Sequence, residues 1–87
     1  MQIVKVMYRK YMNGMDSGFY GGMEYAFKTE LPLACGDKVL VPSGSENELK
    51  RAIVVDVNVD PATIEDWVRK ILKPITMYDP EGGPVNG

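Results

Sequence analysis

The chain has 87 residues, of which 45% are hydrophobic and 25% charged, and its formal net charge is −2. This length fits one domain with a thin core, and the composition is typical of a folded protein rather than a disordered one. The slightly acidic balance argues against a protein that binds polyanions with its whole surface, and the lack of histidine removes the usual general base and metal ligand.

The single cysteine, Cys35, excludes a disulfide within the chain, which fits a reducing compartment. With no histidine to activate it, Cys35 is expected to be a small buried hydrophobic residue. The first residues alternate with polar ones and do not resemble a signal peptide, and no apolar run is long enough to span a bilayer. We therefore expect a cytoplasmic protein that does not bind membranes.

The first third of the chain predicts two strands separated by a glycine-rich loop. Residues 2–8 alternate in polarity and place Tyr8 on the same face as two valines. Residues 23–29 alternate again and place Phe27 on an aromatic face. Between them, residues 12–22 contain Asn-Gly, Ser-Gly and Gly-Gly pairs, which favour a long flexible connection.

The middle of the chain predicts a core plug and two further strands. Leu31 and Leu33 flank a proline, so this segment is expected to close one end of the core rather than to join the sheet. A Gly-Asp turn then leads into a third strand over residues 38–41, which ends at Pro42. After a polar loop, residues 50–57 form a fourth strand whose apolar character on both faces indicates a central position.

Two alternatives remain open after the fourth strand. Asp60 followed by proline is typical of a helix start, and the apolar periodicity predicts one amphipathic helix from Pro61 to Lys73. The alternative is a short helix near Pro61 to Asp66, followed by a fifth strand from Trp67 to Leu72. A tail rich in proline and glycine then follows, so we expect one domain over residues 1–78 and a flexible tail over 79–87.

Three segments resemble known proteins: Lys28-Thr29-Glu30-Leu31-Pro32-Leu33, Gly36-Asp37-Lys38-Val39-Leu40-Val41-Pro42 and Ala52-Ile53-Val54-Val55-Asp56-Val57. Together they cover about the middle third of the chain. They resemble small uncharacterised bacteriophage proteins and, more distantly, the N-terminal DNA-binding barrel of the primosomal helicase PriA. The phage group usually continues with a strand that contains tryptophan, which favours the strand alternative for Trp67 to Leu72. The resemblance implies a mainly β fold, a small open barrel of four or five strands, in a phage protein acting in the bacterial cytoplasm.

Phe19 and Tyr20 are the first candidate site, because they are large aromatic residues inside the glycine-rich segment. Loops often carry function, and aromatic residues dominate many protein interfaces. We expect these two residues to contact a partner. The alternative is that the segment packs back onto its own barrel.

The second candidate site combines aromatic and basic residues from two strands. Such a set could stack bases and neutralise phosphates, as barrels that bind single-stranded nucleic acid do. The alternative is that the first tyrosine belongs to the core and the charges form a solvated strand end. The residues are Tyr8, Arg9, Lys10, Tyr11, Lys50 and Arg51.

The chain provides no recognisable catalytic machinery. The segment from Gly14 to Gly22 lacks the ending of a phosphate-binding P-loop, and no nucleophile–base pair or metal-ligand set can be assembled. We expect no catalytic residue, no metal site, no cofactor and no enzymatic activity.

Three functions remain open. The first is an interaction module that binds a host or phage protein and inhibits a host activity. The second is a barrel that binds single-stranded nucleic acid, and the third is a binder of a small nucleotide signal. A monomer and a homodimer are both compatible with exposed strand edges.

Overall fold

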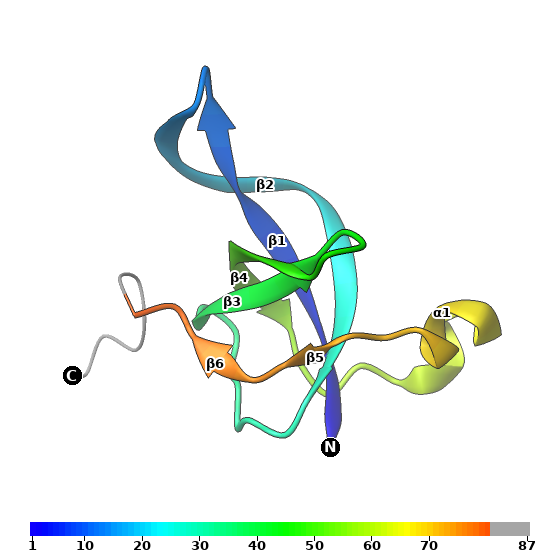
Figure 1. The fold of residues 1–87 in the computed structure, drawn as a ribbon. Coiled ribbons are helices and arrows are strands. Elements are labelled where there is room, and N and C mark those ends of the chain that lie inside the picture. Colours follow the sequence, from blue (N-terminus) through cyan, green and yellow to red (C-terminus); the bar gives the residue numbers. More distant parts are fainter. Residues whose placement is uncertain (81–87) are drawn as a thin grey trace.

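The computed structural model describes residues 1–80 and builds them into six strands and two short helical segments. In chain order these are β1 (Gln2–Met12), β2 (Met15–Thr29), β3 (Lys38–Ser43), β4 (Glu48–Asp56), the 3-10 helix η1 (Pro61–Thr63), α1 (Asp66–Lys70), β5 (Pro74–Ile75) and β6 (Met77–Tyr78). The mainly β fold predicted from the sequence is therefore confirmed (Figure 1).

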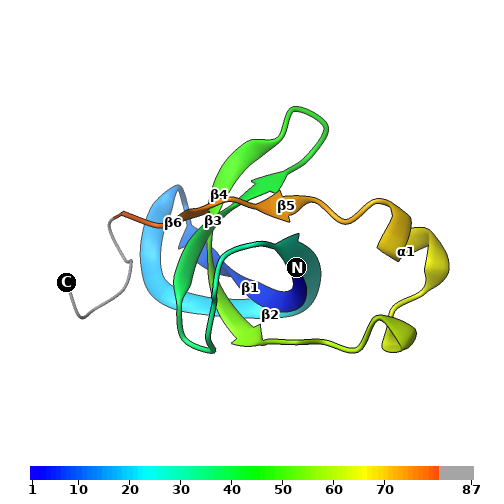
Figure 2. The same ribbon diagram turned by 90° about the horizontal axis from the view of Figure 1, so that it is seen from below.

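The strands form one mixed sheet in the order β5-β2-β1-β4-β3-β6, which curls into a small open barrel. Neighbouring strands are antiparallel except for β2 and β5. Only Thr76 separates β5 from β6. β5 pairs with β2 at one edge of the sheet, and β6 pairs with β3 at the other edge (Figure 2). The predicted open barrel is confirmed. It has six strands among the described residues rather than the predicted four or five, because the two-residue strands β5 and β6 add to its edges.

The barrel encloses one apolar core, supplied mainly by alternate residues of its strands. The inward face of β1 is fully buried at Val4 and Val6, and Tyr8 packs against its edge. Leu33 is buried and Leu31 packs against the same core, which confirms the predicted plug. The buried apolar residues are Val4, Val6, Phe27, Leu33, Val39, Val41, Ala52, Val54 and Ile75. Fully burying a side chain such as valine or phenylalanine stabilises a fold by about 1.5–3 kcal/mol, so this set stabilises the barrel.

β1 and β2 form one long hairpin, and the flexible loop predicted over residues 12–22 is wrong. Met12 pairs with Met15, and the two residues between them, Asn13 and Gly14, have φ of 53° and 80°. Positive φ at both central positions is the geometry of a type I′ turn, for which Asn-Gly is a favoured pair. This one dipeptide makes the whole connection, so the later glycines belong to a strand.

Two bulges bend β2 along the hairpin. Pairing passes from Val6–Tyr25 to Tyr8–Gly21, and then from Arg9–Tyr20 to Tyr11–Asp16. Each step advances two residues on β1 and four on β2, so β2 carries extra residues at both places. Gly22 and Gly18 lie in these extra segments with φ of 89° and 85°, a region that glycine adopts at little cost.

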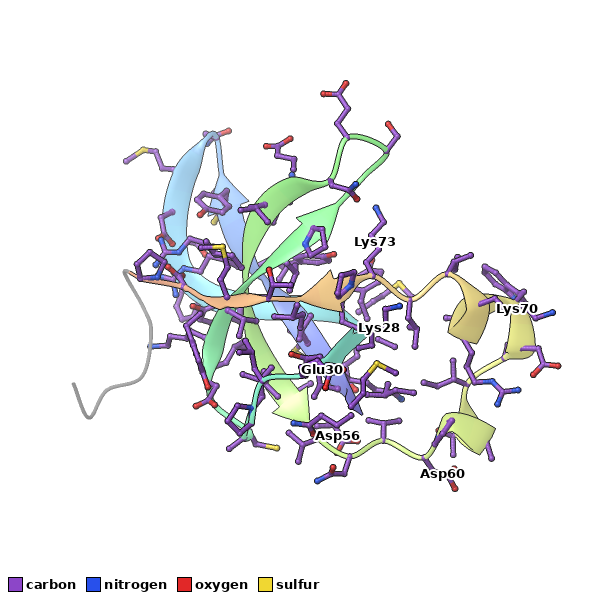
Figure 3. The ribbon with its side chains drawn as sticks, turned by 60° about the horizontal axis from the view of Figure 1, so that its bottom comes forward. Lys28, Glu30, Asp56, Asp60, Lys70 and Lys73 are labelled. Atoms are coloured by element: carbon purple, nitrogen blue, oxygen red, sulfur yellow. The ribbon has the colours of Figure 1, made fainter. Side chains whose placement is uncertain are left out.

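Residues 57–73 lead away from the barrel and back to it, and they do not form the single helix predicted from Pro61 to Lys73 (Figure 3). The short helix predicted near Pro61 to Asp66 is confirmed as η1, and its start is as predicted, because the Asp60 carboxylate accepts the Ala62 N–H at 2.9 Å. The helix is interrupted by extended backbone at Ile64 and Glu65, and α1 is only five residues long. None of its residues is buried, and the apolar face that predicted a long helix is only partly covered, because Val68 is half-buried whereas Trp67 is exposed.

The predicted strand from Trp67 to Leu72 is also wrong, because Trp67 lies in α1 and is 63% exposed. The chain returns to the sheet only at β5. There the Lys28 N–H donates to the Lys73 carbonyl at 3.1 Å, immediately before Pro74. The returning strand therefore lies later in the chain than the resemblance implied.

The folded domain extends beyond residue 78, so the assignment of Asp79 to the tail is wrong. Asp79 is 1% exposed, and its carboxylate accepts a hydrogen bond from Arg51 Nε at 2.7 Å. Its N–H donates to the Lys38 carbonyl at 3.0 Å. Within the predicted tail, residues 81–87 lie outside the described residues.

Candidate functional site

The end of the β1–β2 hairpin projects from the barrel as a two-stranded arm, which we define as residues 9–23 (Figure 1). β4 pairs with β1 only from Lys5 to Tyr8, and β5 pairs with β2 only at Lys28 and Thr29. Within the described part of the chain, the arm therefore has strand partners only inside its own hairpin. An isolated two-stranded hairpin is at best marginally stable, so other contacts must hold the arm in place.

The arm exposes several large apolar side chains. Met12 and Met15, directly opposite each other beside the turn, are 68% and 73% exposed. Phe19 and Met23 are 71% and 72% exposed, and Tyr11 is 52% exposed. Aromatic residues and methionine are enriched in protein interfaces, and methionine adapts to irregular surfaces. The arm is therefore a candidate contact surface.

Polar side chains hold the bulge that carries Phe19. The Asp16 carboxylate accepts the Gly18 N–H at 2.9 Å, and the Ser17 hydroxyl accepts the Phe19 N–H at 3.2 Å. The same hydroxyl donates to the Lys10 carbonyl at 2.9 Å across the hairpin. The backbone on both sides of the bulge is thus bonded, and the Phe19 ring is presented from a defined position.

A chain of ion pairs links the arm to the barrel. Asp16 accepts from Arg9 Nε at 2.7 Å and from Arg51 Nη1 of β4 at 3.3 Å, and Arg51 also binds buried Asp79. The hydrogen bond from Arg9, followed by that from the Gly18 N–H, lowers the pKa of Asp16 below its usual value. The hydrogen bond to Asp79 raises the pKa of Arg51. Asp16 therefore stays ionised at neutral pH, where it orders both the bulge and the base of the arm.

The structure separates the two residues predicted to contact a partner. Phe19 points to solvent, whereas Tyr20 is partly buried and its hydroxyl is buried. The Arg9 guanidinium carbon lies 4.8 Å from the centre of the Tyr20 ring, in the range of a cation–π contact. Phe19 is thus the exposed member of the pair, and Tyr20 helps to fix the arm.

The residues predicted to bind nucleic acid come together in part. β1 and β4 diverge beyond Tyr8 and Ala52, and the space between them is a groove of about 480 Å³. The groove is lined by Tyr8, Arg9, Tyr11, Glu48, Leu49, Lys50 and Arg51. The predicted residue outside it is Lys10, whose side chain lies against Gly21 and Gly22. Both arginines of the groove are already paired with carboxylates, which weakens their attraction for phosphate.

One predicted feature differs from the structure elsewhere. Cys35 is exposed and its thiol lies 3.5 Å from the Val55 carbonyl, so the expected buried position is wrong. It follows the plug residue Leu33 in a turn at the barrel surface, where no core side chains cover it. Within residues 1–80, no group of three or more Cys, Asp or Glu side chains could hold a metal ion.

Sequence reasoning missed Asp16, Ser17 and the arm methionines. The signal that could have found them is Asn13-Gly14, because a type I′ turn sets Met12 opposite Met15 and brings Asp16 and Ser17 back beside β1.

None of the helices in the described part of the chain has the length and apolar character needed to cross a membrane. Comparisons with protein-family models, curated proteins and solved structures find no match to this chain.

Proposed function

We propose that this chain is a non-enzymatic interaction module that binds a protein partner through its arm, with Phe19 as the central contact. The observation that carries the proposal is a phenyl ring, 71% exposed, on a bulge whose backbone is held by Asp16 and Ser17. A few aromatic anchors supply most of the binding energy in many interfaces. An anchor that is ordered before binding loses less conformational entropy when it docks.

The surroundings of Phe19 indicate the chemistry of the partner. Three charges at the base of the arm, those of Arg9, Asp16 and Arg51, are paired with one another. The exposed apolar side chains of the arm, Met12 and Met15 among them, suit an apolar groove on the partner. We therefore propose binding that depends little on salt. In keeping with the phage resemblance, we propose a host or phage protein as the partner and inhibition of a host activity as the outcome.

A site-specific crosslinking experiment tests this function. A photoreactive phenylalanine analogue replaces Phe19, and in a control protein it replaces Glu46, which is exposed in the β3–β4 loop. Each protein is irradiated in bacterial cells. Unlabelled wild-type protein and the Phe19→Ser variant then compete for the crosslinked partner in lysate.

We expect a discrete crosslinked product from position 19 and none of that size from position 46. Wild-type protein should compete it away, and Phe19→Ser should compete at least tenfold less well, since losing a central aromatic anchor commonly costs 2 kcal/mol or more, or about 30-fold in affinity. Equal competition by wild type and Phe19→Ser would show that the arm is not the contact surface.

A second candidate function is binding of single-stranded nucleic acid in the groove between β1 and β4. The favouring observation is that Tyr8, Tyr11 and Lys50 line the same groove. Fluorescence anisotropy with labelled single-stranded DNA at low and moderate salt tests it, because phosphate contacts make affinity fall steeply with salt. No binding at low salt would eliminate this candidate.

A further inference from the structure

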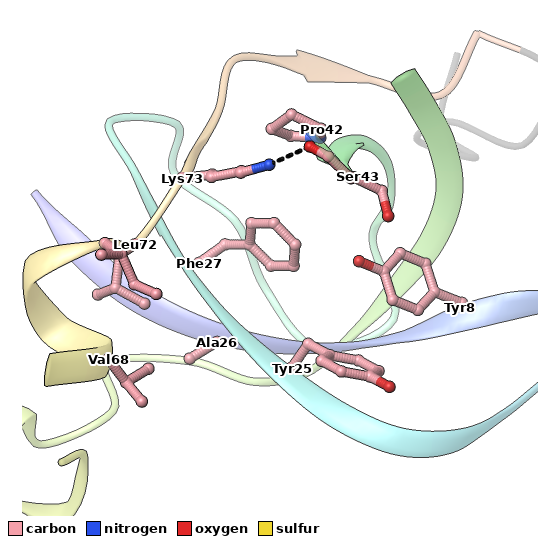
Figure 4. A pocket seen from close by; sticks show the side chains of 11 residues that line it. Tyr8, Tyr25, Ala26, Phe27, Pro42, Ser43, Val68, Leu72 and Lys73 are labelled. Atoms are coloured by element: carbon pink, nitrogen blue, oxygen red, sulfur yellow. Dashed lines mark hydrogen bonds between the residues drawn. The ribbon is translucent and has the colours of Figure 1, made fainter. Parts of the chain in front are cut away.

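A hollow outside the arm lies between the barrel and the segment that follows α1 (Figure 4). Its volume is about 240 Å³. Figure 4 shows Phe27 between Tyr8 on one side and Leu72 on the other, with Tyr25 opposite Lys73. The rings of Tyr8 and Tyr25 are in contact, with centroids 5.0 Å apart and planes tilted by 53°. Three aromatic side chains therefore face one small space.

The hollow contains one charged side chain. Lys73 lines it, and no aspartate or glutamate does so among the described residues. The Lys73 ammonium donates to the Gly44 carbonyl at 2.6 Å, which occupies one of its three N–H donors. A positive charge beside aromatic and aliphatic walls, with donors left over, is complementary to a single anionic group.

We propose that this hollow binds a small aromatic acid. The ring system packs against Tyr8, Tyr25 and Phe27, and the carboxylate, sulfonate or phosphate of the ligand accepts hydrogen bonds from Lys73. Drug-sized ligands occupy pockets of about 300–1,000 Å³, so a hollow just below this range suits one or two rings with an acidic group. Aromatic rings prefer tilted or offset contacts, and the mutually tilted rings of Tyr8 and Tyr25 can make such contacts with the ring of a ligand. The site shares no residue with the arm and does not depend on the function proposed for it.

Nuclear magnetic resonance titrations with two matched ligands test the proposal. The probes are 2-naphthoate and its uncharged counterpart 2-naphthylmethanol, which share the same rings. The readout is the set of aromatic carbon–proton signals of Tyr8, Tyr25 and Phe27, compared with those of Phe19 on the arm. Ring currents from a bound naphthalene shift the signals of the side chains it contacts, so the readout also locates the ligand.

We expect 2-naphthoate to shift the three hollow signals saturably and to leave Phe19 unchanged. The neutral alcohol should bind roughly two- to fivefold more weakly, the effect of losing one charged contact near the surface. Lys73→Met should remove the difference in affinity between the acid and the alcohol. The variant should still bind the alcohol, which would show that the hollow is intact. Lys73→Arg should preserve the preference for the acid.

Three outcomes would overturn the proposal: no saturable shift at the hollow, equal affinity for the acid and the alcohol in the wild type, or shifts confined to Phe19. The Phe19→Ser variant separates this site from the arm. It should bind 2-naphthoate as the wild type does, even if the arm proves to have no partner.

Discussion

Strand β2 carries both phenylalanines of the chain, and they lie in opposite environments. Phe27, in the barrel half of the strand, is 5% exposed, whereas Phe19, in the arm half, is 71% exposed. The barrel half is stabilised by burial of apolar side chains against β1. The arm half has no core beneath it and is held by Asp16, Ser17 and their hydrogen bonds. One strand thus combines a segment that stabilises the fold with a segment that displays a side chain.

The largest expected effect on the free energy of unfolding comes from removing the buried ring of Phe27, with removal of the exposed ring of Phe19 as the control. Phe27→Ala should lower the free energy of unfolding by about 3–5 kcal/mol, since it removes a buried aromatic side chain and leaves a cavity. Phe19→Ala is the matched control and should change it by less than about 0.5 kcal/mol, as an exposed substitution does. Urea denaturation followed by circular dichroism measures both. Similar losses for the two variants would mean that the arm is part of the cooperative core.

Breaking the ion pairs that link the arm to the barrel should have the next largest effect on the free energy of unfolding. Arg51→Met takes the Arg51 hydrogen bond from the buried carboxylate of Asp79 and should cost about 2–3 kcal/mol of unfolding free energy at neutral pH. Arg9→Met removes an ion pair to the exposed carboxylate of Asp16 and should leave global stability nearly unchanged. Urea denaturation measures both variants. The double variant Arg51→Met/Asp79→Asn should regain part of the loss, and no recovery would contradict the role assigned to the pair.

Backbone geometry at the bulge should produce a smaller, local effect. Gly18 has φ of 85°, so Gly18→Ala places a side chain in the left-handed region at a cost of about 1–2 kcal/mol, although nothing lies within 4 Å of the added carbon. Gly21→Ala is the control, because Gly21 lacks a positive φ and its added carbon makes an ordinary 3.6 Å contact with Lys10. Hydrogen exchange of the arm amides measures the difference. Equal exchange in both variants would show that the bulge is not specified by Gly18.

The contrast between barrel and arm explains what the sequence could predict. Alternating β-branched residues determine the barrel half, because each inward residue such as Val4 or Val6 finds apolar neighbours wherever the sheet closes. The arm depends on particular contacts between distant residues. Asp16 meets Arg51 of β4, and Arg51 meets Asp79 near the end of the described chain, so no local pattern reveals the network.

Two local patterns had competing interpretations. The glycines after Asn13 predicted a loop, but one type I′ turn made the connection and left Gly18 and Gly22 for bulges. In the same way, the apolar periodicity around Trp67 predicted a long helix, but periodicity does not show how much of that face the barrel covers, and Trp67 stays exposed. Phe19 and Tyr20 are neighbours of similar type, and only the bulge decides which of them faces solvent.

The smallest expected effect is the response of the arm to acid. Because the pKa of Asp16 is lowered in the fold by Arg9 and by the Gly18 N–H, its charge stabilises the arm above the ordinary carboxylate pKa of about 4. That contribution is lost as pH falls through the lowered pKa. The Gly18 and Phe19 amides should therefore show constant exchange protection between about pH 5 and pH 7, after correction for intrinsic rates, and a loss of protection below about pH 4.

Variants of Asp16 isolate this titration from that of other carboxylates. Asp16→Asn should lower the protection of the Gly18 amide already at neutral pH and remove the acid step, whereas Glu24→Gln, an exposed change on the same strand, should keep both. The chemical shift of the Gly18 amide, followed against pH, reports the titration directly, because this N–H donates to the carboxylate at 2.9 Å. A midpoint at or above the ordinary carboxylate value would mean that the Asp16 contacts do not persist in solution, and the arm would then lack the order that the binding of Phe19 requires.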